Sequence, residues 1–176
     1  MTAAKNKDFA QGCTERKVPF RFLCRLCVFA RRNTNYYIRT RIARSAEQDG
    51  WGLVSGPDGS FLFPNGARRQ PDAAWFNAAR WKAAKASAPG TRVPVFAPEF
   101  VIEVRSPEQR IRMQREKMQE YVANGVLLGW LIDPVDRTVT VYRPGRAPEI
   151  LSNPVTASGE GPVAGFVLDL ERVFAG

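Results

Sequence analysis

The spacing of apolar and polar side chains predicts short strands that alternate with a few helices. Apolar residues recur every three or four positions in three segments that we interpret as helices, residues 36–48, 78–88 and 108–124. Short apolar or alternating runs predict strands over residues 51–55, 60–63, 71–76, 99–105, 127–132, 138–143 and 149–151. The sequence therefore predicts an α/β fold of the mixed, α+β kind, in which helices flank one largely antiparallel sheet.

Residues that favour turns mark the boundaries of these elements. Pro57-Asp58-Gly59 predicts a hairpin between residues 51–55 and 60–63, and Pro64-Asn65-Gly66 predicts a second turn. Residues 133–136, Asp-Pro-Val-Asp, predict a further hairpin. These turns support a meander of neighbouring strands.

The helix over residues 108–124 is expected to be the longest in the chain. Glu108 lies in its predicted first turn, and Gly125 is the expected C-terminal stop. Ser106 is expected to cap its N-terminus, with a hydrogen bond to a water of the site as the alternative. Asn77 is the expected cap of the shorter helix at 78–88.

One carboxylate interrupts an otherwise apolar strand. Residues 99–105 are apolar on both faces apart from Glu103, as in a central strand that is covered on both sides. A carboxylate there is costly unless it binds a proton, a basic partner or a metal ion. The alternative to a metal is a buried salt bridge to a neighbouring arginine.

A second acid, Asp72, begins the strand predicted over residues 71–76. By itself, Asp72 is well explained as an ordinary turn aspartate after Pro71. If its strand lies beside that of Glu103, however, the two carboxylates can converge on one ion. Mg²⁺, or Mn²⁺, held by two carboxylates would neutralise a phosphodiester and activate the attacking water, because hard cations prefer oxygen ligands. Asp72 and Glu103 are thus candidate metal ligands for phosphodiester hydrolysis.

Lys117 is a candidate third member of this site. It lies at the border of the apolar stripe of the helix at 108–124, so its long stem could carry the ammonium towards the carboxylates. There it could orient the attacking water or stabilise the transition state. The alternative, which spacing alone favours, is a solvated lysine paired with Glu116 or Glu120.

The composition limits the number of domains, the location of the protein and the metals that it can bind. The 176 residues are 44% hydrophobic, which is enough for one domain with a core. No apolar run approaches the length of a membrane span, so we expect a cytoplasmic protein without a membrane partner. Cys13, Cys24 and Cys27 lie in the first 27 residues, and the chain contains no histidine. A complete zinc site is therefore improbable, and free thiols are expected.

The net charge of +9 comes entirely from the N-terminal quarter of the chain. Residues 1–44 contain eleven lysines and arginines against two acids, whereas residues 45–176 contain equal numbers of both signs. A basic arm of this kind can bind phosphates non-specifically, and a disordered, solvated tail explains it equally well.

Several motifs, in order along the chain, resemble those of a known family. They are Phe63-Pro64-Asn65-Gly66, Pro71-Asp72-Ala73-Ala74-Trp75, residues 100–107 (FVIEVRSP), residues 116–121 (EKMQEY), Asn124-Gly125, residues 129–134 (GWLIDP) and residues 141–145 (VYRPG). Together they resemble the Uma-type restriction endonuclease family of the PD-(D/E)XK nuclease superfamily. The resemblance covers residue 31 to the end of the sequence.

The resemblance implies a restriction-endonuclease-like core and magnesium-dependent DNA cleavage. Asp72 matches the aspartate of the family's PD motif, and Glu103 matches the acid of its second half-motif. Arg105 stands where the superfamily usually has a lysine, and Lys117 resembles a relocated version of that lysine. Arginine keeps its proton in proteins, so Arg105 could stabilise charge but could not act as a base.

The same resemblance divides the chain into two parts. Residues 31–176 form the expected nuclease domain, and residues 1–30 form an atypical basic segment that does not look like the hairpin and helix with which the family usually begins. We therefore expect a metal-dependent DNA endonuclease, and a homodimer if it cuts both strands. The alternatives are a non-catalytic nucleic-acid- or partner-binding domain on a degenerate scaffold, or a nuclease for RNA or a small phosphodiester.

Overall fold

The computed structural model describes residues 34–175, except for Trp51 and residues 56–58. The expected N-terminal segment and the three cysteines lie outside these described residues. No helix of the described part is long and apolar enough to cross a bilayer.

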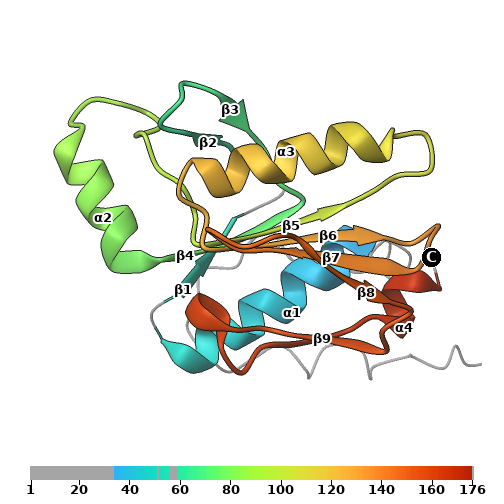
Figure 1. Ribbon diagram of the computed structural model, residues 1–176. Helices are drawn as coiled ribbons and strands as arrows, with labels where there is room; N and C mark the ends of the chain where they lie inside the picture. The colour runs from blue at the N-terminus through green and yellow to red at the C-terminus, as the bar shows by residue number, and fades with distance from the viewer. Residues whose placement is uncertain (1–33, 51, 56–58, 176) are drawn as a thin grey trace, which may run out of the picture.

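A six-stranded mixed sheet forms the centre of the molecule (Figure 1). Its strands, in spatial order, are β1 (Gly52–Val54), β4 (Ala73–Asn77), β5 (Phe100–Val104), β6 (Leu128–Asp133), β7 (Thr138–Tyr142) and β8 (Glu149–Ser152). The β5–β6 pair is parallel and the other pairs are antiparallel. The predicted mixed α+β fold and the largely antiparallel pairing are confirmed.

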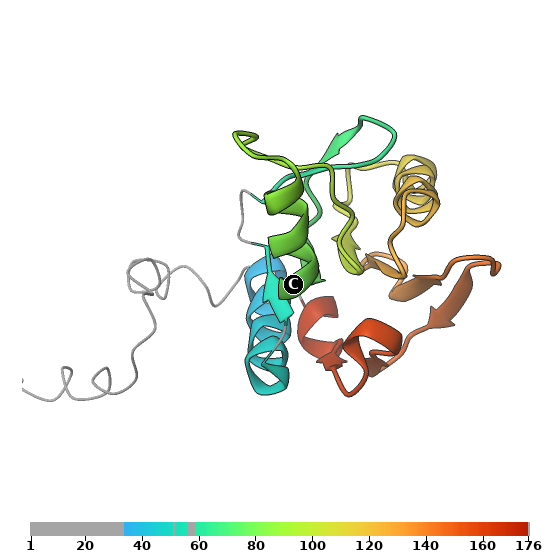
Figure 2. The ribbon, with the colours of Figure 1, turned by 90° about the vertical axis from the view of Figure 1, so that its left-hand side faces the viewer.

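Both faces of the sheet are covered, as Figures 1 and 2 show. One face carries α2 (Ala78–Ser87), α3 (Ile111–Ala123) and the small hairpin of β2 (Phe61–Leu62) and β3 (Arg68–Arg69). The other carries α1 (Thr34–Asp49) and the C-terminal elements β9 (Thr156–Ser158), a 3₁₀ turn (Gly161–Val163), β10 (Val167–Asp169) and α4 (Glu171–Phe174). Each face has its own hydrophobic core.

Alternation along β5 assigns its side chains to the two cores. Phe100 and Ile102 pack on the α1 side, where Phe100 meets Trp130 edge-to-face with ring centroids 5.0 Å apart. Val101 packs on the α3 side. Because side chains two apart in a strand share a face, Glu103 also points to the α3 side.

Two predictions at the N-terminal end of the described chain have opposite outcomes. The helix predicted over residues 36–48 is confirmed as α1, and its apolar face of Ile38, Ile42 and Ala46 is buried. The predicted pairing of residues 51–55 with residues 60–63 is wrong, and residues 56–58 of the expected turn lie outside the described part of the chain. β1 pairs with β4, whereas β2 turns back onto β3.

The second predicted turn, Pro64-Asn65-Gly66, is confirmed. Gly66 adopts a positive φ of 81°, and the amide of Ala67 donates to Oδ1 of Asn65 at 3.0 Å. This tight turn closes β2 onto β3 and leaves the edge of β4 to β1. Local turn residues could not predict the partner of β1, because that partner, β4, is not adjacent to it in the chain.

The start of α3 also differs from the prediction. The helix begins at Ile111, not at Glu108, and at 13 residues it is shorter than the 16-residue α1. Ser106 does not cap it. Instead, the Ser106 amide donates to Oε1 of Gln109 and the Gln109 amide donates to the Ser106 carbonyl, which makes a separate turn before the helix. The predicted stop is confirmed, since Gly125 follows α3 with a φ of 104°.

The capping role of Asn77 gives a stability prediction. The amides of Ala79 and Arg80 donate to its Oδ1 at 3.0 and 3.1 Å. We expect Asn77→Ala to lower the free energy of unfolding by about 1 kcal/mol, because two amides at the start of α2 lose their acceptor. Asn77→Ser, which keeps an acceptor, should stay close to wild type in urea denaturation. Equal losses in both variants would contradict the assignment.

Candidate active site

Pairing of β4 with β5 brings the two predicted carboxylates side by side. Ala73 lies opposite Ile102 in this antiparallel pair. Asp72, just before Ala73, and Glu103, just after Ile102, are therefore neighbours across the strands. Ala74, two residues after Asp72, packs in the α3-side core, so the alternation of β4 gives Asp72 the same face as Glu103. The sequence-based condition that the two strands be neighbours is met.

Asp72 is held by three hydrogen bonds from two elements, α1 and β5. Its Oδ1 accepts a hydrogen bond from Nδ2 of Asn35 in α1 at 2.7 Å, and its Oδ2 accepts from the amide of Val104 in β5 at 2.8 Å. Nε of Arg39 donates to its carbonyl oxygen at 2.6 Å. Both side-chain bonds reach distant segments, so the interpretation as a purely local turn aspartate is wrong.

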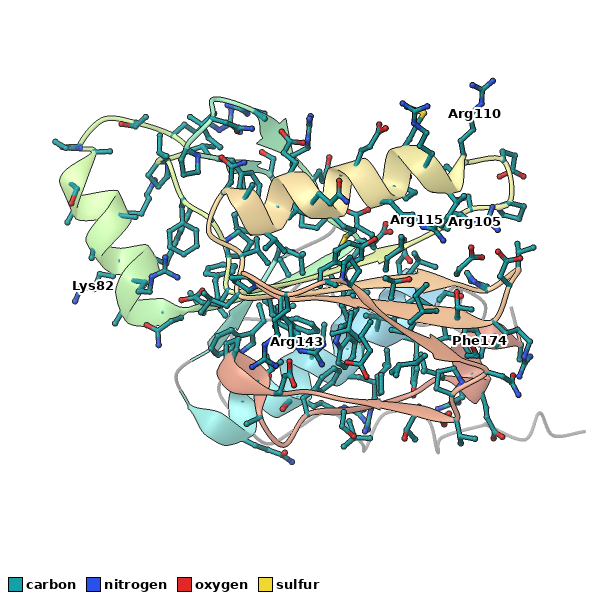
Figure 3. The ribbon with its side chains drawn as sticks, viewed as in Figure 1. Lys82, Arg105, Arg110, Arg115, Arg143 and Phe174 are labelled. Atoms are coloured by element: carbon teal, nitrogen blue, oxygen red, sulfur yellow. The ribbon has the colours of Figure 1, made fainter. Side chains whose placement is uncertain are left out.

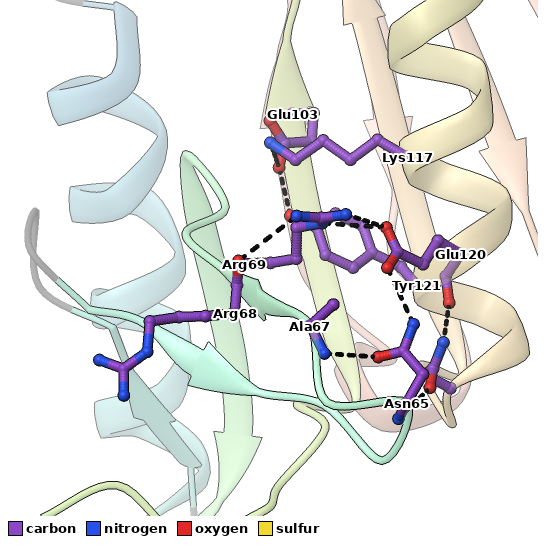
Figure 4. Close-up of polar contacts among 9 residues, drawn as sticks. Asn65, Ala67, Arg68, Arg69, Glu103, Lys117, Glu120 and Tyr121 are labelled. Atoms are coloured by element: carbon purple, nitrogen blue, oxygen red, sulfur yellow. Dashed lines mark hydrogen bonds and ion pairs between the residues drawn. The ribbon is translucent and has the colours of Figure 1, made fainter.

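Glu103 receives two donors from one helix, as Figure 4 shows. Nζ of Lys117 lies 2.7 Å from Oε1 of Glu103, and the hydroxyl of Tyr121 donates to the same oxygen at 2.8 Å. No described residue donates a hydrogen bond to Oε2. One carboxylate oxygen is therefore saturated by the protein, and the other keeps its lone pairs for a ligand.

The favoured alternative for Lys117 is wrong. Glu120 instead binds Arg69, whose Nη2 lies 2.7 Å from Oε2 of Glu120, and Glu116 pairs with Arg112. With both acids of its own helix engaged elsewhere, Lys117 pairs with Glu103 in the sheet. Glu103 does form a buried salt bridge, but its partner is a lysine from the next helix.

Burial dominates the electrostatics of this group. Glu103 is 4% exposed, and its burial raises the pKa of the carboxyl above the ordinary value of 4.5. The positive charge of Lys117 opposes this rise in pKa, and the negative charge of Asp72 adds to it. Burial also raises the pKa of Tyr121, so its hydroxyl remains a donor to Glu103.

The three predicted residues open onto one pocket of about 730 Å³. Its lining includes Asp72, Glu103, Lys117 and Arg105. Within the described residues, no group of three or more acidic, histidine or cysteine side chains could hold a metal ion. Two carboxylates nevertheless fit Mg²⁺, which proteins commonly hold through one or two carboxylates while waters and substrate oxygens complete the shell.

Arg105 contributes a fixed positive charge at the edge of this pocket. Its Nε lies 2.6 Å from Oδ2 of Asp133, and its Nη1 donates to the carbonyl of Gln109 at 3.2 Å. Burial raises the pKa of Asp133, but the bond and charge of Arg105, together with the amides of Asp136 and Val135, leave that pKa below its usual value. The guanidinium is thus immobilised beside the site.

Sequence reasoning missed several residues that shape the site. Tyr121 is buried in the core, and its spacing of four from Lys117 places both residues on one helix face, where its hydroxyl reaches Glu103. Asn35 and Gln70 also line the pocket, and no motif or spacing in the sequence distinguishes them from other polar residues. Asn65 and Arg69 both bond to Glu120 and thereby tie the β2–β3 hairpin to α3.

The raised pKa of Glu103 predicts a pH-dependent stability difference between wild type and Glu103→Gln. At pH values well below 4.5, the Glu103 carboxyl is protonated in both the folded and the unfolded state of wild type. As the pH rises above that value, the unfolded state releases the proton more readily, so wild type loses stability relative to the glutamine variant. Urea denaturation across this range should show the difference. The exposed Glu47→Gln serves as control, and a pH-independent difference for Glu103→Gln would contradict the account.

Comparisons with known proteins agree with this fold. A putative nuclease belonging to DUF820 from Anabaena variabilis is similar in structure, with a TM-score of 0.67 and 22% sequence identity. The match covers 81% of this chain and 78% of that one. At this identity the likeness establishes the fold. No curated protein matches the chain significantly.

The sequence itself matches a family model described as Uma2, putative restriction endonuclease, over residues 30–171. This range contains the whole central sheet, α3 and every residue that lines the pocket except Val173. The chain therefore belongs to the Uma2 family.

Proposed function

We propose that this protein is a metal-dependent DNA endonuclease that hydrolyses phosphodiester bonds. The observation that carries the proposal is the meeting of Asp72, Glu103 and Lys117 in one pocket. The pairing of β4 with β5 brings the two carboxylates together, and α3 adds the ammonium of the lysine. This is the set of charges that hydrolysis of an anionic diester requires.

Asp72 and Glu103 are the proposed ligands for Mg²⁺, with Mn²⁺ as a substitute. Each oxygen of Asp72 accepts one hydrogen bond from the protein, which orients the carboxylate and leaves lone pairs for a cation. Glu103 offers Oε2 in the same way. The bound ion would supply Lewis-acid neutralisation of the phosphate and a more acidic water.

Lys117 has two proposed tasks. Before substrate binds, its ammonium partly compensates the buried charge of Glu103, with Nζ at 2.7 Å from Oε1. Its side chain is 26% exposed and lines the pocket, so the same ammonium can orient the attacking water or donate to a phosphate oxygen as negative charge develops.

Arg105 is proposed to add electrostatic stabilisation only. Its guanidinium is held by Asp133 at the pocket edge, where it can face an anionic diester. Because the guanidinium keeps its proton, it cannot act as a base, and the bound metal ion would make the attacking water more acidic.

The direct test is cleavage of supercoiled plasmid with Mg²⁺ or Mn²⁺. We expect Asp72→Ala and Glu103→Ala each to lower the rate about a hundredfold or more, and Lys117→Ala to lower it by a similar factor, because each removes charge at the transition state. Chelation of the metal should abolish cleavage in wild type.

Matched controls come from the far end of the molecule and from the surface of α1. Lys82, labelled in Figure 3, is exposed on α2 and projects away from the pocket, and Glu47 is exposed on α1. Lys82→Ala and Glu47→Gln should cleave like wild type. Equal rates in all five variants and wild type would overturn the assignment, and DNA binding without any cleavage would favour a non-catalytic binding domain.

Cleavage of both strands would be explained most simply by two copies acting together. If a homodimer acts, the rate at which the linear product forms should rise more steeply with protein concentration than the rate at which the nicked product forms.

A further inference from the structure

The pocket has two chemically different walls. Asp72, Glu103 and Lys117 form the polar wall already described. Facing the same space, Pro107, Pro134 and Val135 form what we call the apolar wall. Their segments, the stretch after β5 and the β6–β7 turn, lie together at the right-hand end of the sheet in Figure 1.

The apolar wall is held rigidly. Oδ1 of Asp133 accepts hydrogen bonds from the amides of Val135 at 3.0 Å and Asp136 at 3.2 Å. Its other oxygen, Oδ2, binds Arg105. One carboxylate thus fixes both the turn that presents Val135 and the guanidinium beside the polar wall, so the two walls keep a constant relation to each other.

Exposure alone does not give Val135 a role, because isolated apolar residues are common on protein surfaces. Val155, for example, is 61% exposed and does not line the pocket, whereas Val135 is 56% exposed and does. The difference lies in the surroundings. The exposed face of Val135 opens onto a pocket of about 730 Å³, within the range of roughly 300–1,000 Å³ that takes whole small ligands.

A cation and one phosphate need only the polar wall. The same pocket is also lined by the apolar wall, whose three side chains have no polar atoms, so this part of the pocket fits the apolar faces of a sugar and a base. In a duplex both faces of a base are covered by stacking, and its edge is paired. Only an unpaired nucleotide can turn its face to a protein wall.

We propose that the apolar wall binds the sugar and base of the nucleotide next to the scissile phosphate, and that this nucleotide is unpaired. The preferred substrate class is therefore single-stranded or locally unpaired nucleic acid. The inference rests on the proposed function, since the polar wall must hold the phosphate for the apolar wall to meet the adjoining base.

The test compares Val135→Ser with Val155→Ser, the same substitution at a valine of similar exposure. The probe is a fluorescent oligothymidylate, alone or annealed to its complement, with binding followed by anisotropy in Ca²⁺ in place of Mg²⁺ and the intact length of the probe checked on a gel. We expect Val135→Ser to bind the single strand about fivefold more weakly, because apolar contact is lost. Its duplex binding and the Val155→Ser variant should match wild type.

The salt dependence of binding provides a further check. Valine carries no charge, so the slope of log affinity against log salt should be the same in Val135→Ser and wild type. Equal single-strand affinity in the two serine variants would overturn the inference, as would an equal loss on duplex.

These outcomes are independent of the cleavage assay. Selective loss of single-strand binding without any cleavage by wild type would support the apolar wall and reject the endonuclease proposal. Cleavage by wild type, with no effect of Val135→Ser on binding, would support the endonuclease proposal and reject the role of the apolar wall.

Discussion

The rest of the site depends on the two bonds that the buried carboxylate of Glu103 accepts from helix α3. Two donors of that helix, Lys117 and Tyr121, converge on Oε1, so the central strand and the helix are fixed against each other at one atom. Losing either donor would leave a buried charge poorly compensated, which is costly in an apolar core. The same bonds leave Oε2 for a ligand.

The second carboxylate depends on the sheet as a whole. Asp72 sits beside Glu103 because β4 and β5 pair in one register, and a slip of one residue would turn its side chain to the opposite face. Asn35 of α1 then orients the carboxylate from below the sheet edge, while the Val104 amide binds its other oxygen. Three segments that are far apart in sequence are thus needed to aim one side chain.

How much the sequence predicts follows from the range of the interactions involved. Periodicity was enough to predict α1 and the central strands, and Glu103 stood out because a carboxylate in an apolar strand demands a partner. Pairing of β1 with β4 cannot be predicted from local turn residues, because the two strands are not adjacent in the chain. Spacing along a helix favours Glu116 or Glu120 as the partner of Lys117, because it cannot show that arginines engage both acids. The pairing with Glu103 agrees with the other interpretation, in which the lysine stem reaches towards the carboxylates.

The central claim is that Asp72 and Glu103 together hold a divalent cation, and calorimetric titration with Mn²⁺ tests it most directly. We expect wild type to bind at one site that needs both carboxylates. Asp72→Asn and Glu103→Gln, which keep the shape of each side chain, should each abolish that binding, whereas Glu47→Gln should retain it. Undiminished Mn²⁺ affinity in either site variant would contradict the account.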